Sequence, residues 1–245
     1  MGARAPDVHG PRVDEVSEPA GGGVASPSVP ASPYRAVLFD FGGVLTTSPF
    51  HAMRRWAVQN GHNPDVVLDL VLGPYDEDGD HPFQRAERGE VGFGVAFSET
   101  AARATALGIS LDGMWGVNKM TPQPEMIALA EAIRRAGLRT AVVSNTLKGL
   151  GARWRELVPI DELVDVVIES AEVGMRKPGP GIYKLALDLL GGPEGPIAPE
   201  RAIFLDDHAG NIRGAEAVGI RSIYVDDDPT EAIGELRALL GIEGC

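Results

Sequence analysis

The clearest indication of the fold class is the segment Ala36-Val37-Leu38-Phe39-Asp40-Phe41-Gly42-Gly43. Its four consecutive apolar residues, followed closely by two glycines, are typical of a strand buried on both faces of a parallel sheet. Asp40 comes directly after the apolar run and is therefore predicted to lie at the carboxyl end of that strand. In open α/β sheets this end forms the edge at which ligands bind.

Later apolar runs repeat this arrangement. We predict further strands over residues 140–143, 164–168, 202–205 and 222–225. Helical spacing of apolar residues predicts helices over 126–133, 180–190 and 211–218. Strands that alternate with helices predict an α/β fold with a doubly wound, Rossmann-like parallel sheet.

Two segments differ from this pattern. Residues 1–33 are dominated by Gly, Pro, Ala and Ser, and such a segment buries too little apolar surface to offset its ordering entropy, so it is predicted to be a disordered tail. Residues 51–122 show helical periodicity without a strand-like run, which predicts a helical insertion. The α/β core is accordingly predicted to consist of residues 34–50 and 123–245.

Composition excludes several classes of protein. The chain has 245 residues and a formal net charge of −13, so broad binding to nucleic acid or to anionic membranes has no electrostatic support. The single cysteine, Cys245, excludes an intramolecular disulfide, and no Cys/His cluster has the spacing of a zinc site. No targeting segment or apolar run of about 18 residues is visible, so we expect a cytoplasmic protein. The sequence does not indicate an oligomeric state.

Polar residues follow several of the predicted strands. Their convergence at one edge of the sheet would bring together Asp40, Ser144, Lys177, Asp206 and Asp207. Three crowded carboxylates repel one another unless a cation lies between them. An all-oxygen site with open positions favours Mg²⁺ over zinc, and Lys177 supplies a second positive charge.

These segments resemble the four motifs of the haloacid dehalogenase superfamily of hydrolases. The motifs occur in order as residues 39–45, residues 143–145, Lys177-Pro178, and residues 204–207 continuing to Asn211. The resemblance covers residues 34 to 240. Within the superfamily, residues 168–178 and 87–91 resemble the phosphatase domain of soluble epoxide hydrolases and bacterial sugar-1-phosphate phosphatases. This resemblance implies that the insertion, residues 51–122, is a helical cap that closes over the site.

The resemblance also implies roles for individual residues. Asp40 would be the nucleophile that forms an aspartyl-phosphate, which water then hydrolyses. Mg²⁺ would be held by Asp40 and Asp207, by Asp206 directly or through water, and by the backbone carbonyl of Gly42. Ser144, Asn145 and Lys177 would bind the substrate, a small phosphorylated metabolite.

One position departs from the family pattern. Most phosphatases of the superfamily carry a second aspartate two residues after the nucleophile, where it protonates the leaving oxygen, whereas this chain has Gly42. The sugar-1-phosphate phosphatases share a glycine there. The departure predicts that substrates with good leaving groups are favoured.

Structural roles remain open for several of these residues. Asp40, Asp207 or Asn145 could cap a following helix, Ser144 could be a turn residue, and Asn211 could be either a cap or a residue that supports the metal site. We expect Arg176 to be solvated, and the same role is open for Lys177. We expect surface positions for His51, His62 and His81, any of which could replace the missing acid. The core of the cap is expected to contain Trp56, Phe83, Phe93, Phe97 and Trp115. Residues 76–80 are expected to form a solvated loop.

Two other functions remain open. A metal-free 2-haloacid dehalogenase also uses an aspartate nucleophile, but the Asp206-Asp207 pair argues against it. A binding or regulatory module with weakened catalysis would account for Gly42, although the retained acidic residues and Lys177 argue against that reading.

Overall fold

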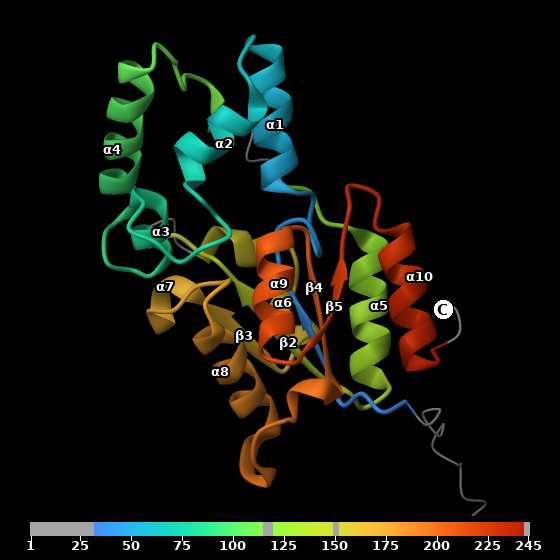
Figure 1. Ribbon diagram of the computed structural model, residues 1–245. Coiled ribbons are helices and arrows are strands. Elements are labelled where there is room, and N and C mark those ends of the chain that lie inside the picture. Colours follow the sequence, from blue (N-terminus) through green and yellow to red (C-terminus); the bar gives the residue numbers. More distant parts are fainter. Residues whose placement is uncertain (1–31, 115–119, 149–151, 243–245) are drawn as a thin grey trace, which may run out of the picture.

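The computed structural model describes residues 32–114, 120–148 and 152–242. Trp115, Cys245 and nearly all of the predicted N-terminal tail lie outside these ranges. The described chain forms an α/β core below a group of helices (Figure 1).

A five-stranded parallel sheet forms the centre of the core. Its strand order is β3-β2-β1-β4-β5, and every neighbouring pair is parallel, so the predicted doubly wound sheet is confirmed. The strands are β1 (Ala36–Phe39), β2 (Arg139–Ser144), β3 (Val166–Glu169), β4 (Ala202–Asp206) and β5 (Arg221–Tyr224). Each lies within two residues of its prediction.

Helices cover both faces of the sheet. The core helices are α5 (Pro124–Arg135), α6 (Ile160–Leu163), α7 (Ser170–Val173), α8 (Pro180–Gly191), α9 (Ala209–Ala217) and α10 (Thr230–Leu240), with short 3₁₀ segments at η2 (Ala152–Glu156), η3 (Gly192–Glu194) and η4 (Pro199–Arg201). Alternate strand residues face opposite layers: Val37 and Phe39 pack with α5 and α10, whereas Leu38 packs with α8 and α9 (Figure 1). The central strands are thus buried on both faces, as their continuous apolar runs require.

The helical insertion comprises α1 (Pro49–Gln59), α2 (Pro64–Leu72), α3 (Pro82–Glu87) and α4 (Phe93–Ala106). Proline at the first position begins α1, α2 and α3, where a missing N–H is no loss and the fixed φ favours the helix. The insertion has its own apolar core, which includes the predicted Trp56 and Phe83, with Phe93 packed against it. It lies above the carboxyl edge of the sheet (Figure 1).

Within the described ranges, no helix has the length and apolar character needed to cross a membrane.

Candidate active site

Strand register places the predicted acidic residues side by side. Phe39 at the end of β1 pairs with Leu205 of β4 and with Val142 of β2. The next residue on β1, Asp40, therefore stands level with Asp206, and its backbone N–H donates to the Leu205 carbonyl at 2.8 Å. Neighbouring strands lie about 4.8 Å apart, so two side chains level with each other on adjacent strands come within reach.

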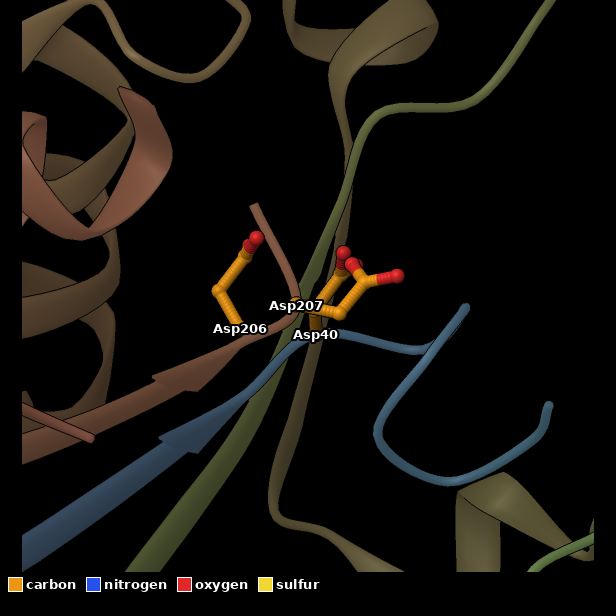
Figure 2. Close-up of side chains that lie close together, drawn as sticks. All are labelled: Asp40, Asp206 and Asp207. Atoms are coloured by element: carbon orange, nitrogen blue, oxygen red, sulfur yellow. The ribbon is translucent and has the colours of Figure 1, made fainter. Parts of the chain in front are cut away.

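Three carboxylates meet at this edge of the sheet. Oxygens of Asp40, Asp206 and Asp207 all lie within 4.8 Å of one another, and all three residues are buried (Figure 2). The Lys177 ammonium pairs with Asp206 at 2.6 Å and with Asp40 at 2.9 Å. Lys177 is completely buried, so the solvated alternative for this side chain is wrong. Three negative charges and one positive charge leave a formal excess of −2.

Burial and mutual repulsion shift the ionisation of this cluster. Burial, together with the charge of Asp206, raises the pKa of Asp40 to about 7, although Lys177 opposes the shift. Burial and the charges of Asp206 and Asp40 raise the pKa of Asp207 well above its usual value. Burial lowers the pKa of Lys177, but its pairing with the two aspartates outweighs burial and raises it. The site therefore favours any cation that offsets its negative charge.

The Asp207 carboxylate fits a metal ligand. Both of its oxygens are buried, and neither makes a hydrogen bond of normal geometry to a described residue, although the nearby Ser48 hydroxyl lowers the pKa of the group. Buried polar groups are normally satisfied, so a group left unpaired beside two other carboxylates indicates a missing partner. The donors are all hard oxygen atoms, which suits a small divalent cation held by Asp40, Asp206 and Asp207.

Two glycines allow the chain to turn tightly around the cluster. Gly43 has φ +84°, and a Cβ atom there would lie 2.1 Å from Cγ of Asp207, so only glycine permits this close approach. A Cβ atom on Gly42 would lie 3.1 Å from Cδ of Pro49. The first residue of α1 thus packs directly against position 42.

Ser144 and Asn145, at the end of β2, have different surroundings. Ser144 ends β2 and is buried one residue beyond the level of Asp40. The Asn145 side chain accepts from the Lys177 backbone N–H at 2.9 Å and donates to the Lys177 carbonyl at 3.0 Å. Its amide also donates to the Tyr75 hydroxyl at 3.0 Å. Asn145 therefore holds the backbone of Lys177, and both N–H groups of its side-chain amide have acceptors.

Asn211 supports the cluster and does not cap a helix. Its amide nitrogen donates to both Asp206 oxygens, at 3.0 and 3.1 Å. The cap of α9 is instead His208, whose ring nitrogen accepts from the Gly210 N–H. The capping alternatives for Asn211 and Asp207 are therefore wrong. His208 also packs against the rings of Phe50 and Tyr75, and sequence reasoning missed it although it directly follows Asp207.

Arg176 corrects the sequence expectation. It is only 1% exposed, not solvated, and its Nε donates to Glu87 of α3 at 2.7 Å. Its guanidinium lies 4.6 Å from the centre of the Tyr75 ring, and Tyr75 in turn donates to Glu87 at 2.9 Å. Glu87 and Tyr75 stand about 90 to 100 residues before Arg176, so no local pattern could reveal that they would bury its charge.

None of the three histidines named as a possible acid has a hydrogen bond or ion pair with the described aspartates of the cluster. His51 pairs with Asp227 in the loop after β5, and the ring of His62 lies 5.9 Å from that of Trp56. His81 is 9% exposed and caps α3, so its expected surface position is wrong. Residues 76–80 are largely exposed, as expected, although Asp76 and Asp78 pair with Arg213 and Arg88.

The chain is similar to several known proteins. The chain matches the haloacid dehalogenase-like hydrolases over residues 34–219. It is 37% identical over 220 residues to acyl-CoA dehydrogenase family member 10 of Mus musculus and 29% identical over 230 residues to bifunctional epoxide hydrolase 2 of Sus scrofa, in each case over 85% of this chain. The matches span only 19% and 39% of those two proteins.

A shorter match is 32% identical over 120 residues to phosphoserine phosphatase of Thermus thermophilus, spanning 46% of each chain. Among solved structures, an enzyme of this family from Bacteroides thetaiotaomicron, in complex with magnesium and inorganic phosphate, has a TM-score of 0.54 at 19% identity, covering 81% of this chain and 98% of its own. A dehalogenase has a TM-score of 0.60 at 18% identity, covering 86% and 98%. The fold, the order of the strand-end residues and the match over residues 34–219 together identify this chain as a member of the haloacid dehalogenase-like hydrolase family.

Proposed function

We propose that this protein is a Mg²⁺-dependent phosphatase that hydrolyses small phosphorylated metabolites through an aspartyl-phosphate on Asp40. The observation that carries the proposal is the buried cluster in which Lys177 pairs with Asp40 and Asp206, while the Asp207 carboxylate has no cation and no hydrogen bond of normal geometry from the described residues. The relative named as a phosphatase and the neighbouring structure that holds magnesium and phosphate support the same reading.

The reaction would proceed in two displacements at phosphorus. An Asp40 oxygen attacks the phosphoryl group, the Asp40–phosphorus bond forms, and the bond to the leaving oxygen breaks. Lys177 and the Ser144 hydroxyl hold the phosphoryl oxygens, and Asn145 holds the Lys177 peptide. Water then attacks phosphorus and releases phosphate and free Asp40, so that one difficult step becomes two easier ones.

A Mg²⁺ ion held by Asp40, Asp206, Asp207 and the Gly42 carbonyl would supply charge neutralisation for the transferring group. The insertion, placed above the carboxyl edge of the sheet, would act as the cap over residues 34–50 and 123–245. Closure by such a cap would exclude water and hold the substrate in line with Asp40.

Phosphate release from a substrate panel tests the proposal. The panel contains sugar-1-phosphates, acyl phosphates, aryl phosphates and alkyl phosphates, each with Mg²⁺ or with EDTA. We expect release with Mg²⁺ and loss of release with EDTA. Halide release from a 2-haloacid that persists in EDTA would instead identify a dehalogenase, and silence with every compound would favour a binding module.

The rank order within that panel is a separate prediction. We expect acyl, aryl and anomeric sugar phosphates to be hydrolysed faster than primary alkyl phosphates, by about 10²-fold or more, because position 42 holds no acid to protonate a poor leaving group. Comparison of kcat/KM for phenyl phosphate and a primary alkyl phosphate of similar size measures the difference. Equal values would show that another residue supplies the proton.

Stabilisation by Mg²⁺ is expected to depend on pH. Without a cation, the pKa of Asp40 in the folded protein is about 7, above its usual value of 3.8, so the folded state binds the proton more strongly than the unfolded state. Stability present at low pH is then lost as pH rises through about 7. Mg²⁺ binds the ionised carboxylates, so its stabilising effect grows over the same interval.

Thermal unfolding with and without Mg²⁺ at about pH 5.5 and pH 8 measures this effect. At pH 8 and a concentration 100 times the Kd, Mg²⁺ should add about 2.7 kcal/mol. Asp207→Asn is the control variant and should remove most of the gain. An equal gain at both pH values would contradict a site made of protonatable carboxylates.

A further inference from the structure

A closed ring of contacts surrounds the backbone of Lys177. Asn145 grips the Lys177 peptide at both its N–H and its carbonyl and also donates to the Tyr75 hydroxyl. Tyr75 donates to Glu87, and Glu87 accepts from Arg176, whose peptide bond leads back to Lys177. We call these five residues the Lys177 ring.

The helical insertion supplies two members of the Lys177 ring. Glu87 ends α3, and Tyr75 lies in the loop between α2 and α3. The other three members belong to the loops after β2 and α7 of the core. The ring can therefore close only while the insertion lies against the core.

Two charged members of the Lys177 ring, Arg176 and Glu87, are buried, which limits the conformations they can adopt. The Arg176 side chain is 0% exposed and that of Glu87 is 6% exposed. Desolvation of two such charges offsets much of their attraction, so a pair of this kind adds less to stability than its short distance suggests. The geometry of the pair instead limits the conformations available to both side chains. Because Arg176 directly precedes Lys177 in the chain, this limit also applies to the backbone of Lys177.

Lys177 contacts Asp40, the nucleophile of the proposed reaction. Its ammonium lies 2.9 Å from Asp40 and 2.6 Å from Asp206, so a shift of about 1 Å would weaken both contacts. The side chain begins at a backbone that Asn145 holds on both sides. A defect anywhere in the ring is thereby transmitted to the Asp40 contact.

We propose that Tyr75 and Glu87 are positioning residues, which align Lys177 with Asp40 only when the helical insertion is docked on the core. The inference rests on the proposed phosphatase function for its kinetic consequence and on the Lys177 ring alone for its structural one. Neither residue needs to touch the substrate.

Tyr75→Phe is the main test, because it removes one hydroxyl and keeps the aromatic side chain that packs against Arg176 and His208. The matched control is Thr140→Val, which also removes a buried hydroxyl, one that donates to Asp165 at 3.4 Å near the start of β2, outside both the Lys177 ring and the acidic cluster. We expect Tyr75→Phe to lower kcat by about 10- to 100-fold, with a smaller change in KM, as for other residues that orient a catalytic group. Thr140→Val should leave kcat unchanged.

A double-variant cycle adds a readout that lost stability alone would not produce. If the ring acts as a unit, Tyr75→Phe combined with Glu87→Gln should lower kcat no further than the stronger single variant. Additive losses would show that the two residues act separately. An equal kcat for Tyr75→Phe and Thr140→Val in an active enzyme would overturn the inference.

Hydrogen exchange separates this inference from the proposed function. The Lys177 N–H donates to Asn145, so loosening the Lys177 ring should speed the exchange of that amide in Tyr75→Phe and not in Thr140→Val. If the wild-type protein hydrolyses no phosphate ester, faster exchange of that amide still supports positioning while the phosphatase proposal fails. Unchanged exchange overturns the positioning role whatever the activity.

Discussion

Asp40→Asn is expected to reduce phosphate release by about 10⁴-fold or more, because the amide lacks the anionic oxygen that attacks phosphorus. The substitution keeps the shape of the side chain and removes one of the three negative charges of the cluster, so folding should be preserved. Steady-state phosphate release with the best substrate of the panel measures the loss. Rapid acid quench should trap a covalent phosphoryl group on wild-type Asp40 and none on the variant.

Asp188→Asn is the matched control, since Asp188 is exposed on α8 and is not part of the cluster. It should retain wild-type activity. If Asp40→Asn kept more than about one per cent of the rate, the nucleophile would have to be a different group, and the role taken from the family motif would be wrong.

Glu87→Ala should lower the free energy of unfolding by about 3–5 kcal/mol. The substitution leaves the Arg176 guanidinium buried without its main partner, and Arg176 cannot lose its proton to escape the cost. At about 2–4 °C per kcal/mol for a domain of this size, the melting temperature should fall by roughly 10 °C. Thermal and urea unfolding of the purified variant give both quantities.

The control for that prediction is Arg221→Ala. Its pair with Glu235 is equally short, at 2.7 Å, but the two side chains are 53% and 39% exposed. Exposed pairs contribute at most about 1 kcal/mol, so this variant should unfold close to wild type. If Glu87→Ala and Arg221→Ala lowered the free energy of unfolding by similar amounts, burial would not set the strength of the Glu87–Arg176 contact.

The sheet and its acidic edge could be predicted from the sequence because the signals for both are local. A short apolar run followed by glycines, such as residues 36–39 before Gly42 and Gly43, is typical of a buried strand, and Asp40 lies at its end by adjacency alone. Parallel strands place their carboxyl ends at one edge, so Asp40, Asp206 and Asp207 were expected there, and the pairing of β1 with β4 brings them together. Motif order then supplied the family.

The Lys177 ring could not be predicted in this way. Tyr75 and Glu87 lie within the helical insertion, and their partners Asn145 and Arg176 lie far along the chain. A charged residue such as Arg176 is usually solvated, and only docking of the insertion shows which carboxylate compensates its burial. The same holds for His81, which local sequence places on the surface and tertiary packing buries.

Short segments are enough to predict the doubly wound sheet, the acidic edge and the family, because strand periodicity and strand-end residues are local properties. Tertiary packing brings Asn145 to Lys177 and Pro49 beside Gly42, and it places the insertion so that the ring around Lys177 is complete. These features depend on contacts between segments distant in the chain. Such contacts arise from packing of whole layers, and no short pattern encodes which side chains those layers bring together.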